Sequence, residues 1–318
     1  MKIYIAIILF FIFTSCEKGE TPIMPHGSGS MLTSVIELGP DYRYQIFYSL
    51  KQGEIISQNI KTDWDLAISS NIQNLDIRIN TSRAAAAWKT NSYNFDQSYD
   101  LNSATWLCDS PDGNNDSSAL FGIINNEIYI IDKGYSFSGN HTGYVKFAVE
   151  SRTSNSCFIR YGSLDNSFDT VVEIIKNQNF NYVSYSFSQN TVVDVEPEKN
   201  NWDLVFTQYT HIFYNPRTPY LVTGVLINEA NVLVALDTLN PFENISNENL
   251  TQYSFHNNRD VIGYNWKSYD MSAGEYSINT NLNYILNDKD GRYFKLHFID
   301  YYNSSGDKGY PKFEIQEL

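Results

Sequence analysis

The sequence predicts an all-β protein of antiparallel strands with few short helices. After residue 32, apolar and polar residues alternate with period two in segments rich in Tyr, Phe, Val, Ile and Thr. These segments are separated by Asn, Asp, Gly and Ser, and the 35 Asn residues favour turns and lower helix propensity. An aromatic content of 15% and a hydrophobic content of 42% indicate a sizeable core.

The strand segments are recognised one by one from this alternation. The clearest are residues 42–50, 128–131, 144–149, 182–188, 222–227, 276–286 and 293–301. The best candidate for a helical turn is 82–88, because one Arg and four Ala in this segment are good helix formers.

Composition excludes several classes of function. The formal net charge is −14, whereas a protein that binds nucleic acid needs clustered Lys and Arg to displace counterions, so no nucleic-acid partner is expected. The chain contains no G-x-S-x-G elbow, no H-E-x-x-H helix and no Walker loop. We therefore expect a protein that is not an enzyme.

The N-terminus indicates the compartment. Residues 1–15 combine one Lys, an apolar run too short to span a bilayer and small polar residues, as in a secretory signal peptide. Cys16 follows directly, and this order resembles the lipobox of bacterial lipoproteins, in which the Cys carries acyl chains such as palmitate. The acidic segment after it resembles the export tag of surface lipoproteins of Bacteroidetes. We expect residues 16–32 to be a lipidated, flexible tether that anchors the protein to the outer membrane at the cell surface.

Two further cysteines follow, Cys108 and Cys157. In an envelope compartment they could form a disulfide or stay as free thiols, since sequence does not reveal the pairing geometry. Acidic clusters such as 109–116 and 288–290 lack the closing Glu of a calcium loop and are interpreted as turns, and no metal site is predicted.

An internal repeat organises the rest of the chain. Trp64-Asp65-Leu66 recurs 138 residues later as Trp202-Asp203-Leu204, and the tyrosine-rich segments 129–133 and 144–147 resemble 284–288 and 293–296. We interpret the chain as two related β-rich halves, 33–170 and 171–318. In each half the Asp is expected to close the preceding turn, and Trp202, Leu204 and Phe206 to share one face of a strand.

The second half resembles a known family. The order of Trp202-Asp203-Leu204, then Lys289-Asp290-Gly291 and its strand, then the closing segment 309–313, is similar to that of the HmuY family, surface lipoproteins of Bacteroidetes that bind haem. The first half shows only a diverged version of these motifs.

The resemblance implies haem held by two axial side chains, His or Met, in an aromatic cleft. Among the histidines and methionines we expect His211 and His256 as ligands, with Met271 as a further candidate. The cleft could be formed by Phe213, Tyr214, Tyr220, Phe255, Tyr264 and Trp266. The implied function is capture of haem, or a related planar ligand, for transfer to an outer-membrane transporter. The alternative is a non-enzymatic module for protein or glycan contact that kept the fold without haem ligation.

Overall fold

The computed structural model describes residues 28–318 except residue 74. Strands contain 44% of the residues and pair antiparallel, and no helix in the described chain reaches seven residues. The predicted all-β class with few short helices is therefore confirmed. No helix among the described residues has the length and apolar character required to cross a membrane.

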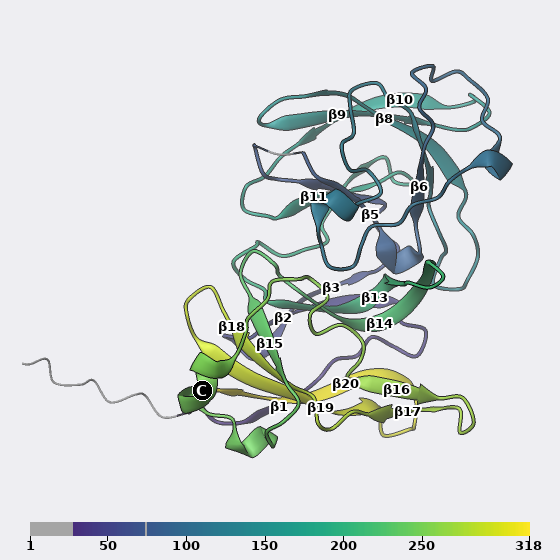
Figure 1. The fold of residues 1–318 in the computed structure, drawn as a ribbon. Helices are drawn as coiled ribbons and strands as arrows, with labels where there is room; N and C mark the ends of the chain where they lie inside the picture. Colours follow the sequence, from purple (N-terminus) through teal and green to yellow (C-terminus); the bar gives the residue numbers. More distant parts are fainter. Residues whose placement is uncertain (1–27, 74) are drawn as a thin grey trace, which may run out of the picture.

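The strands form two bodies, which Figure 1 shows one above the other. The upper body contains two sheets, with orders β10-β9-β8-β7-β6 and β12-β11-β4-β5. Its strands are β4 (Leu66–Ser69), β5 (Ile77–Ile79), β6 (Ala86–Lys89), β7 (Tyr129–Asp132), β8 (Tyr144–Arg152), β9 (Ser156–Gly162), β10 (Asp169–Ile175), β11 (Tyr182–Ser186) and β12 (Thr191–Val193).

The lower body contains the sheets β1-β20-β19-β18-β15 and β14-β13-β2-β3, together with the separate hairpin β16-β17. Its strands are β1 (Leu32–Val35), β2 (Tyr44–Ser49), β3 (Glu54–Ile60), β13 (Leu204–Phe213), β14 (Thr218–Ile227), β15 (Leu233–Asp237), β16 (Lys267–Asp270), β17 (Glu275–Ile278), β18 (Asn283–Asn287), β19 (Tyr293–Tyr302) and β20 (Lys308–Glu317). The short 3₁₀ helices are η1 (Thr81–Arg83), η2 (Leu101–Ser103), η3 (Asn115–Ser117), η4 (Phe242–Asn244) and η5 (Asn247–Gln252).

Each body encloses its own hydrophobic core between its two sheets. The upper core contains side chains from residues 66–187, whereas the lower core combines residues 36–50 with residues 204–315. The upper body is thus one continuous stretch of chain, and the lower body is assembled from the stretches before and after it.

This arrangement exchanges hairpins between the two repeats. Strand β2, from the first half, pairs with β13 of the second half, and β11, from the second half, pairs with β4 of the first half. The bodies therefore do not follow the boundary between residues 170 and 171, and the relation between the two halves stays a prediction. Several repeated contacts favour it.

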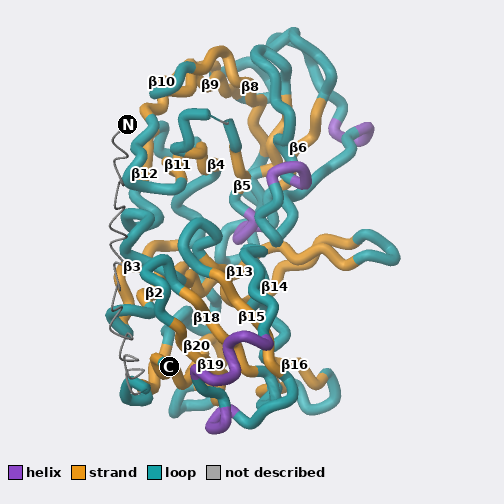
Figure 2. The backbone as a smooth tube through the Cα atoms, turned by 60° about the vertical axis from the view of Figure 1, so that its left-hand side comes forward, coloured by secondary structure: helices purple, strands orange, loops and turns teal. Residues whose placement is uncertain are grey.

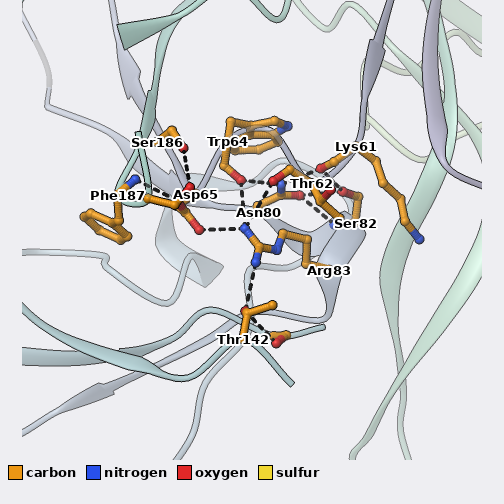
Figure 3. Close-up of polar contacts among 12 residues, drawn as sticks. Lys61, Thr62, Trp64, Asp65, Asn80, Ser82, Arg83, Thr142, Ser186 and Phe187 are labelled. Carbon is orange, nitrogen blue, oxygen red and sulfur yellow. Dashed lines mark hydrogen bonds and ion pairs between the residues drawn. The ribbon is translucent and has the colours of Figure 1, made fainter. Parts of the chain in front are cut away.

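The first repeated contact is the turn that contains Asp65 (Figure 3). The Asp65 amide donates to the carbonyl of Tyr185 at 2.8 Å, and Asp65 Oδ2 accepts from the amide of Phe187 at 2.8 Å. The buried Arg83 pairs with Asp65 Oδ1 at 2.7 Å. The turn therefore holds the end of the hairpin that comes from the other repeat.

Asp203 makes the equivalent contacts in the lower body. Its amide donates to the carbonyl of Tyr48 at 2.9 Å, and its Oδ2 accepts from the amide of Leu50 at 2.7 Å. The expectation that each Asp closes its own preceding turn is thus wrong, because both carboxylates bind the exchanged hairpin instead.

A buried Asn completes each turn. Asn80 Nδ2 donates to the carbonyls of Lys61 and Trp64 at 2.8 and 2.7 Å. Asn228 Nδ2 donates to the carbonyls at the corresponding positions 199 and 202, at 2.8 and 3.0 Å. The two turns thus share an Asp, an Asn and the same backbone acceptors.

A second repeated contact involves buried lysines. Lys146 Nζ donates to the carbonyl of Phe95 at 2.6 Å and lies 4.6 Å from the centre of its ring. Lys295 Nζ donates to the carbonyl of Phe242 at 2.9 Å and also lies 4.6 Å from that ring. The tyrosine-lysine segments matched in the sequence therefore occupy equivalent strands, β8 and β19.

Two local expectations are corrected. The segment 82–88 is not a continuous helical turn: η1 covers only its first two residues and ends at Arg83, Ala84 has a φ of 58°, and β6 begins at Ala86. Ala85, Ala86 and Ala87 are buried, so packing overrides helix propensity. Trp202 does not share a face with Leu204, because it packs with Val205 in a separate cluster.

The first described residues contact the lower body, beginning at Gly29. The Gly29 amide donates to the carbonyl of Glu317 at 2.8 Å, and Gln316 Nε2 donates to the carbonyl of Gly29 at 2.8 Å. Of the segment expected to be a tether, residues 28–32 thus lie along β20, whereas Cys16 and the expected signal peptide lie outside the described residues.

A candidate ligand groove between two hairpins

The candidate site is a groove in the lower body between two hairpins. One wall is the outer part of the β13-β14 hairpin, whose strands pair as far as Phe213 with Thr218 and which projects from the molecule in Figure 2. The other wall is the β16-β17 hairpin. The groove has a volume of about 810 Å³, within the range of small-molecule sites.

The groove has an apolar, aromatic end beside β13 and β14. Phe213 and Tyr220 lie with ring centres 6.2 Å apart, and His211 contacts the rings of Phe213 and Tyr264 at 4.9 and 5.0 Å. Phe213, Tyr220 and Tyr264 all line the groove. His211 thus lies directly behind its aromatic wall, and its buried Nδ1 has no hydrogen-bond partner within the described chain.

The groove also contains phenols and two lysines. The rings of Tyr276 and Tyr301 lie 5.0 Å apart, and Tyr42 stacks on Tyr301 at 6.4 Å. Lys267 Nζ lies 4.8 Å from the centre of the Tyr301 ring, and Lys308 Nζ lies 5.4 Å from that of Tyr42. Burial lowers the pKa of Lys267 to about 7.

The structure places the three expected ligands at different sites. His211 is on β13 beside the groove, and Met271 is 89% exposed in the turn of the β16-β17 hairpin, two residues after Tyr269 of the groove wall. Both hairpins that flank the groove thus carry one candidate ligand.

His256 is not at the groove. Its backbone pairs with Val234 of β15, and its side chain is exposed. Three residues after His256, the carbonyl of Arg259 accepts a hydrogen bond from the amide of Ile227. Ile227 lies seven residues along β14 from Tyr220, the strand partner of His211, which corresponds to about 23 Å. The expected pair of His211 with His256 is therefore not brought together, because the loop before Gly263 follows β14 away from the groove.

Two other described histidines have carboxylate partners. His141 Nε2 lies 2.8 Å from Asp132 Oδ1, and His297 Nε2 lies 2.9 Å from Glu314 Oε2. His297 also stacks on Phe242 at 3.8 Å. These contacts give both rings a structural role.

Of the other aromatic residues expected in the cleft, Trp266 is buried against Phe298 at 4.0 Å, and Phe255 packs on Tyr293 at 5.8 Å. Tyr214 is 69% exposed at the tip of the β13-β14 hairpin. The groove therefore uses Phe213, Tyr220 and Tyr264 from the expected set.

The sequence prediction missed Lys267, Tyr276 and Lys308. Alternation places Lys267 on the same face as Tyr269, and both line the groove, but it does not reveal that the hairpin turns this face toward β14. Position in the fold, rather than residue type, makes these residues part of the site.

The two cysteines are free thiols, so the disulfide that the sequence allowed is not formed. Cys157 lies in the upper core on β9, and Cys108 lies beside Asp109, whose carboxylate holds the amides of Ile79 and Ala119. Burial raises the pKa of both thiols to about 11, which disfavours the reactive thiolate.

A second cavity lies between the two bodies and is lined by Trp64 and Trp202. It has a volume of about 60 Å³, and three of its lining residues have a buried polar atom without a hydrogen-bond partner among the described residues, namely Arg78 Nη1, Trp202 Nε1 and Tyr209 OH. This size and polarity suit a few water molecules, so the groove is the better candidate for a larger ligand.

Comparison with known proteins agrees with the resemblance seen in the sequence. Residues 176–315 match the model of the family described as HmuY protein. No curated protein matches the chain.

Two solved structures are similar to the chain at low identity. A putative HmuY-like heme binding protein from Bacteroides vulgatus has 12% identity, with 90% of each chain covered and a TM-score of 0.25. An apo HmuY analog from Tannerella forsythia has 9% identity, with 92% of this chain and 99% of that chain covered and a TM-score of 0.27. The likeness to the HmuY family thus covers residues 176–315.

Proposed function

We propose that this chain, which carries an HmuY domain over residues 176–315, captures haem or a closely related planar ligand in the groove between the β13-β14 and β16-β17 hairpins. The observation that carries the proposal is the groove itself, whose aromatic end places His211 directly behind the rings of Phe213 and Tyr264. Flat apolar rings suit the faces of a macrocycle.

The donor set fits a haem ligand. His211 Nδ1 is buried without a hydrogen-bond partner, and an imidazole nitrogen is a common axial ligand of haem iron. Met271 occupies the facing hairpin and supplies a thioether, which also ligates haem iron in proteins. We propose His211 as the principal ligand and Met271 as its partner, whereas His256 has no role.

The cellular role follows from the N-terminus. A chain anchored through acylated Cys16 on the outer-membrane surface could hold the ligand until an outer-membrane transporter accepts it. This role is that of a carrier and requires no catalytic group. Cys16 lies outside the described residues, so this part of the proposal is supported by the sequence alone.

A spectroscopic titration tests the proposal. Haem is added to the chain from residue 28 onward, and we expect a Soret shift that saturates at micromolar haem. His211→Ala should weaken binding by at least about tenfold, as loss of an axial ligand would. His256→Ala is the matched control and should leave the titration unchanged.

The proposal has a clear negative outcome. A wild-type titration without any Soret change at micromolar haem would overturn it and favour the module for protein or glycan contact. A titration weakened by His256→Ala rather than His211→Ala would move the site away from the groove.

A further inference from the structure

The groove carries charge of one sign, although the protein as a whole is acidic. The chain has 36 Asp and Glu against 22 Lys and Arg, yet the charged residues that line the groove within the described chain are two lysines, Lys267 and Lys308. Both lie beside phenol rings, those of Tyr301 and Tyr42. The groove therefore combines aromatic walls with two cationic side chains.

Lys267 is an unpaired cation in a buried position. Its side chain is 7% exposed, its Nζ donates to the carbonyl of Thr223 at 2.5 Å, and Nζ lies 4.1 Å from the ring of Trp266. No acidic side chain of the described residues forms an ion pair with it. A buried charge without a partner is costly, and an anionic ligand would supply that partner.

The described residues that line the groove include no His, Met or Cys. Its lining consists of aromatic, aliphatic, amide, hydroxyl and lysine side chains, and His211 lies behind the rings rather than among the lining residues. The shape and charge of the groove thus suit the flat body and the acidic edge of a ligand, in addition to the iron ligation proposed for His211.

We propose that the groove selects planar aromatic carboxylates, that Lys267 and Lys308 bind the carboxylate groups, and that a porphyrin dicarboxylate without iron also binds. This inference rests on the proposed function in using the same groove. It adds the carboxylates to the iron as recognised groups.

The pH dependence of binding follows from the surroundings of Lys267. The titratable groups that face it are the phenols of Tyr276 on β17 and Tyr301 on β19, and burial raises the pKa of both. They therefore stay neutral near pH 7. Lys267, with a pKa near 7, loses its proton as the pH rises, so affinity for a carboxylate should fall by roughly tenfold between pH 7 and pH 8.5.

The first test compares three probes on the wild-type protein by fluorescence or absorbance titration. They are haem, protoporphyrin without iron, and the dimethyl ester of that porphyrin. We expect both haem and the iron-free porphyrin to bind, haem more tightly by the contribution of His211, and the ester to bind at least about tenfold more weakly than the iron-free porphyrin because it lacks the carboxylates. This arm requires no variant and so does not depend on refolding of a mutated groove.

The second test uses substitutions. Lys267→Met should weaken the iron-free porphyrin by at least about tenfold, and the exposed Lys308→Met by about two- to fivefold, with no effect on the ester. Lys51→Met, in the β2-β3 turn and paired with Asp290, is the control and should change nothing. Thermal unfolding of each variant shows that it is folded.

The outcomes separate this inference from the proposed function. Binding of haem without binding of the iron-free porphyrin would overturn the inference and leave haem capture intact. Binding of the iron-free porphyrin without a Soret shift for haem would support the inference and overturn haem capture. Equal binding of the dicarboxylate and its ester would overturn the role of Lys267 and Lys308.

Discussion

Asp65 and Asp203 make matching backbone contacts in two turns but differ in their charged partners. Arg83 pairs with Asp65 at 2.7 Å, whereas no ion pair joins Asp203 to another described residue. Burial raises the pKa of Asp203 to about 6, and its hydrogen bond from Leu50 only partly offsets this effect. Asp203 is therefore a buried carboxyl group that is mostly protonated below about pH 6.

This difference predicts a pH-dependent stability. The unfolded chain releases the Asp203 proton near pH 4, and the folded chain releases it near pH 6. Between these values the folded state binds more protons, so the free energy of unfolding should fall as pH rises, by up to about 3 kcal/mol from this group.

Asp203→Asn tests the effect, because the amide oxygen can still accept from the amide of Leu50 but does not titrate. Chemical denaturation between pH 4 and pH 7 should give a flatter profile for the variant than for the wild type. The exposed Asp116→Asn is the control and should follow the wild-type profile. Parallel profiles for Asp203→Asn and wild type would contradict the prediction.

At the scale of elements, the repeated turns depend on one buried Asn each. Asn228→Ala would leave the carbonyl of Trp202 without its Nδ2 donor, whereas that of Lys199 keeps the donor Asn231, and it should lower the free energy of unfolding by about 1–3 kcal/mol. Urea unfolding measures the loss. Asn281→Ala, in an exposed turn, should cost under about 0.5 kcal/mol. A loss at position 228 no larger than at 281 would show that water replaces the lost donor.

The strands could be predicted from the sequence because period-two alternation follows directly from the geometry of a half-buried strand. The pairing of the hairpins could not be predicted in this way. Tyr44 and Tyr182 begin similar strands, so each repeat offers nearly the same edge to either partner. Only the complete packing decides that β2 joins β13 and β11 joins β4.

The same limit applies to the site. His211, Phe213 and Tyr220 are close in sequence or paired across one hairpin, so the sequence could indicate them. His256 looked equally suitable because it follows Phe255, but long-range contacts decide its place. Nothing in the sequence around Lys267 marks it as a site residue, because its place in the groove depends on how the β16-β17 hairpin packs beside β14.

At the scale of the whole molecule, the family match and the packing do not coincide. Residues 176–315 match the HmuY model, but β11 and β12 of this segment lie in the upper body, and the rest lies in the lower body. The upper body, in contrast, is continuous from β4 to β12 and contains both of its sheets.

We therefore expect residues 62–196 to fold alone. The fragment keeps the upper core and the turn of Asp65 with Phe187, so it should unfold cooperatively in a calorimeter. Residues 62–175 form the control, because removal of β11 and β12 leaves β4 without a neighbour on one side. A fragment 62–196 without a cooperative transition would show that the upper body needs the lower body.

The exchange of hairpins also has a mechanical consequence. Two covalent connections cross between the bodies, one from β3 to β4 and one from β12 to β13, and Trp64 and Trp202 bring them to the same cavity. A single link would allow one body to rotate about the other. Two links side by side allow bending about one axis and resist torsion. Any opening of the molecule should therefore be a directed bend, and the hairpins around the groove should keep their alignment during it.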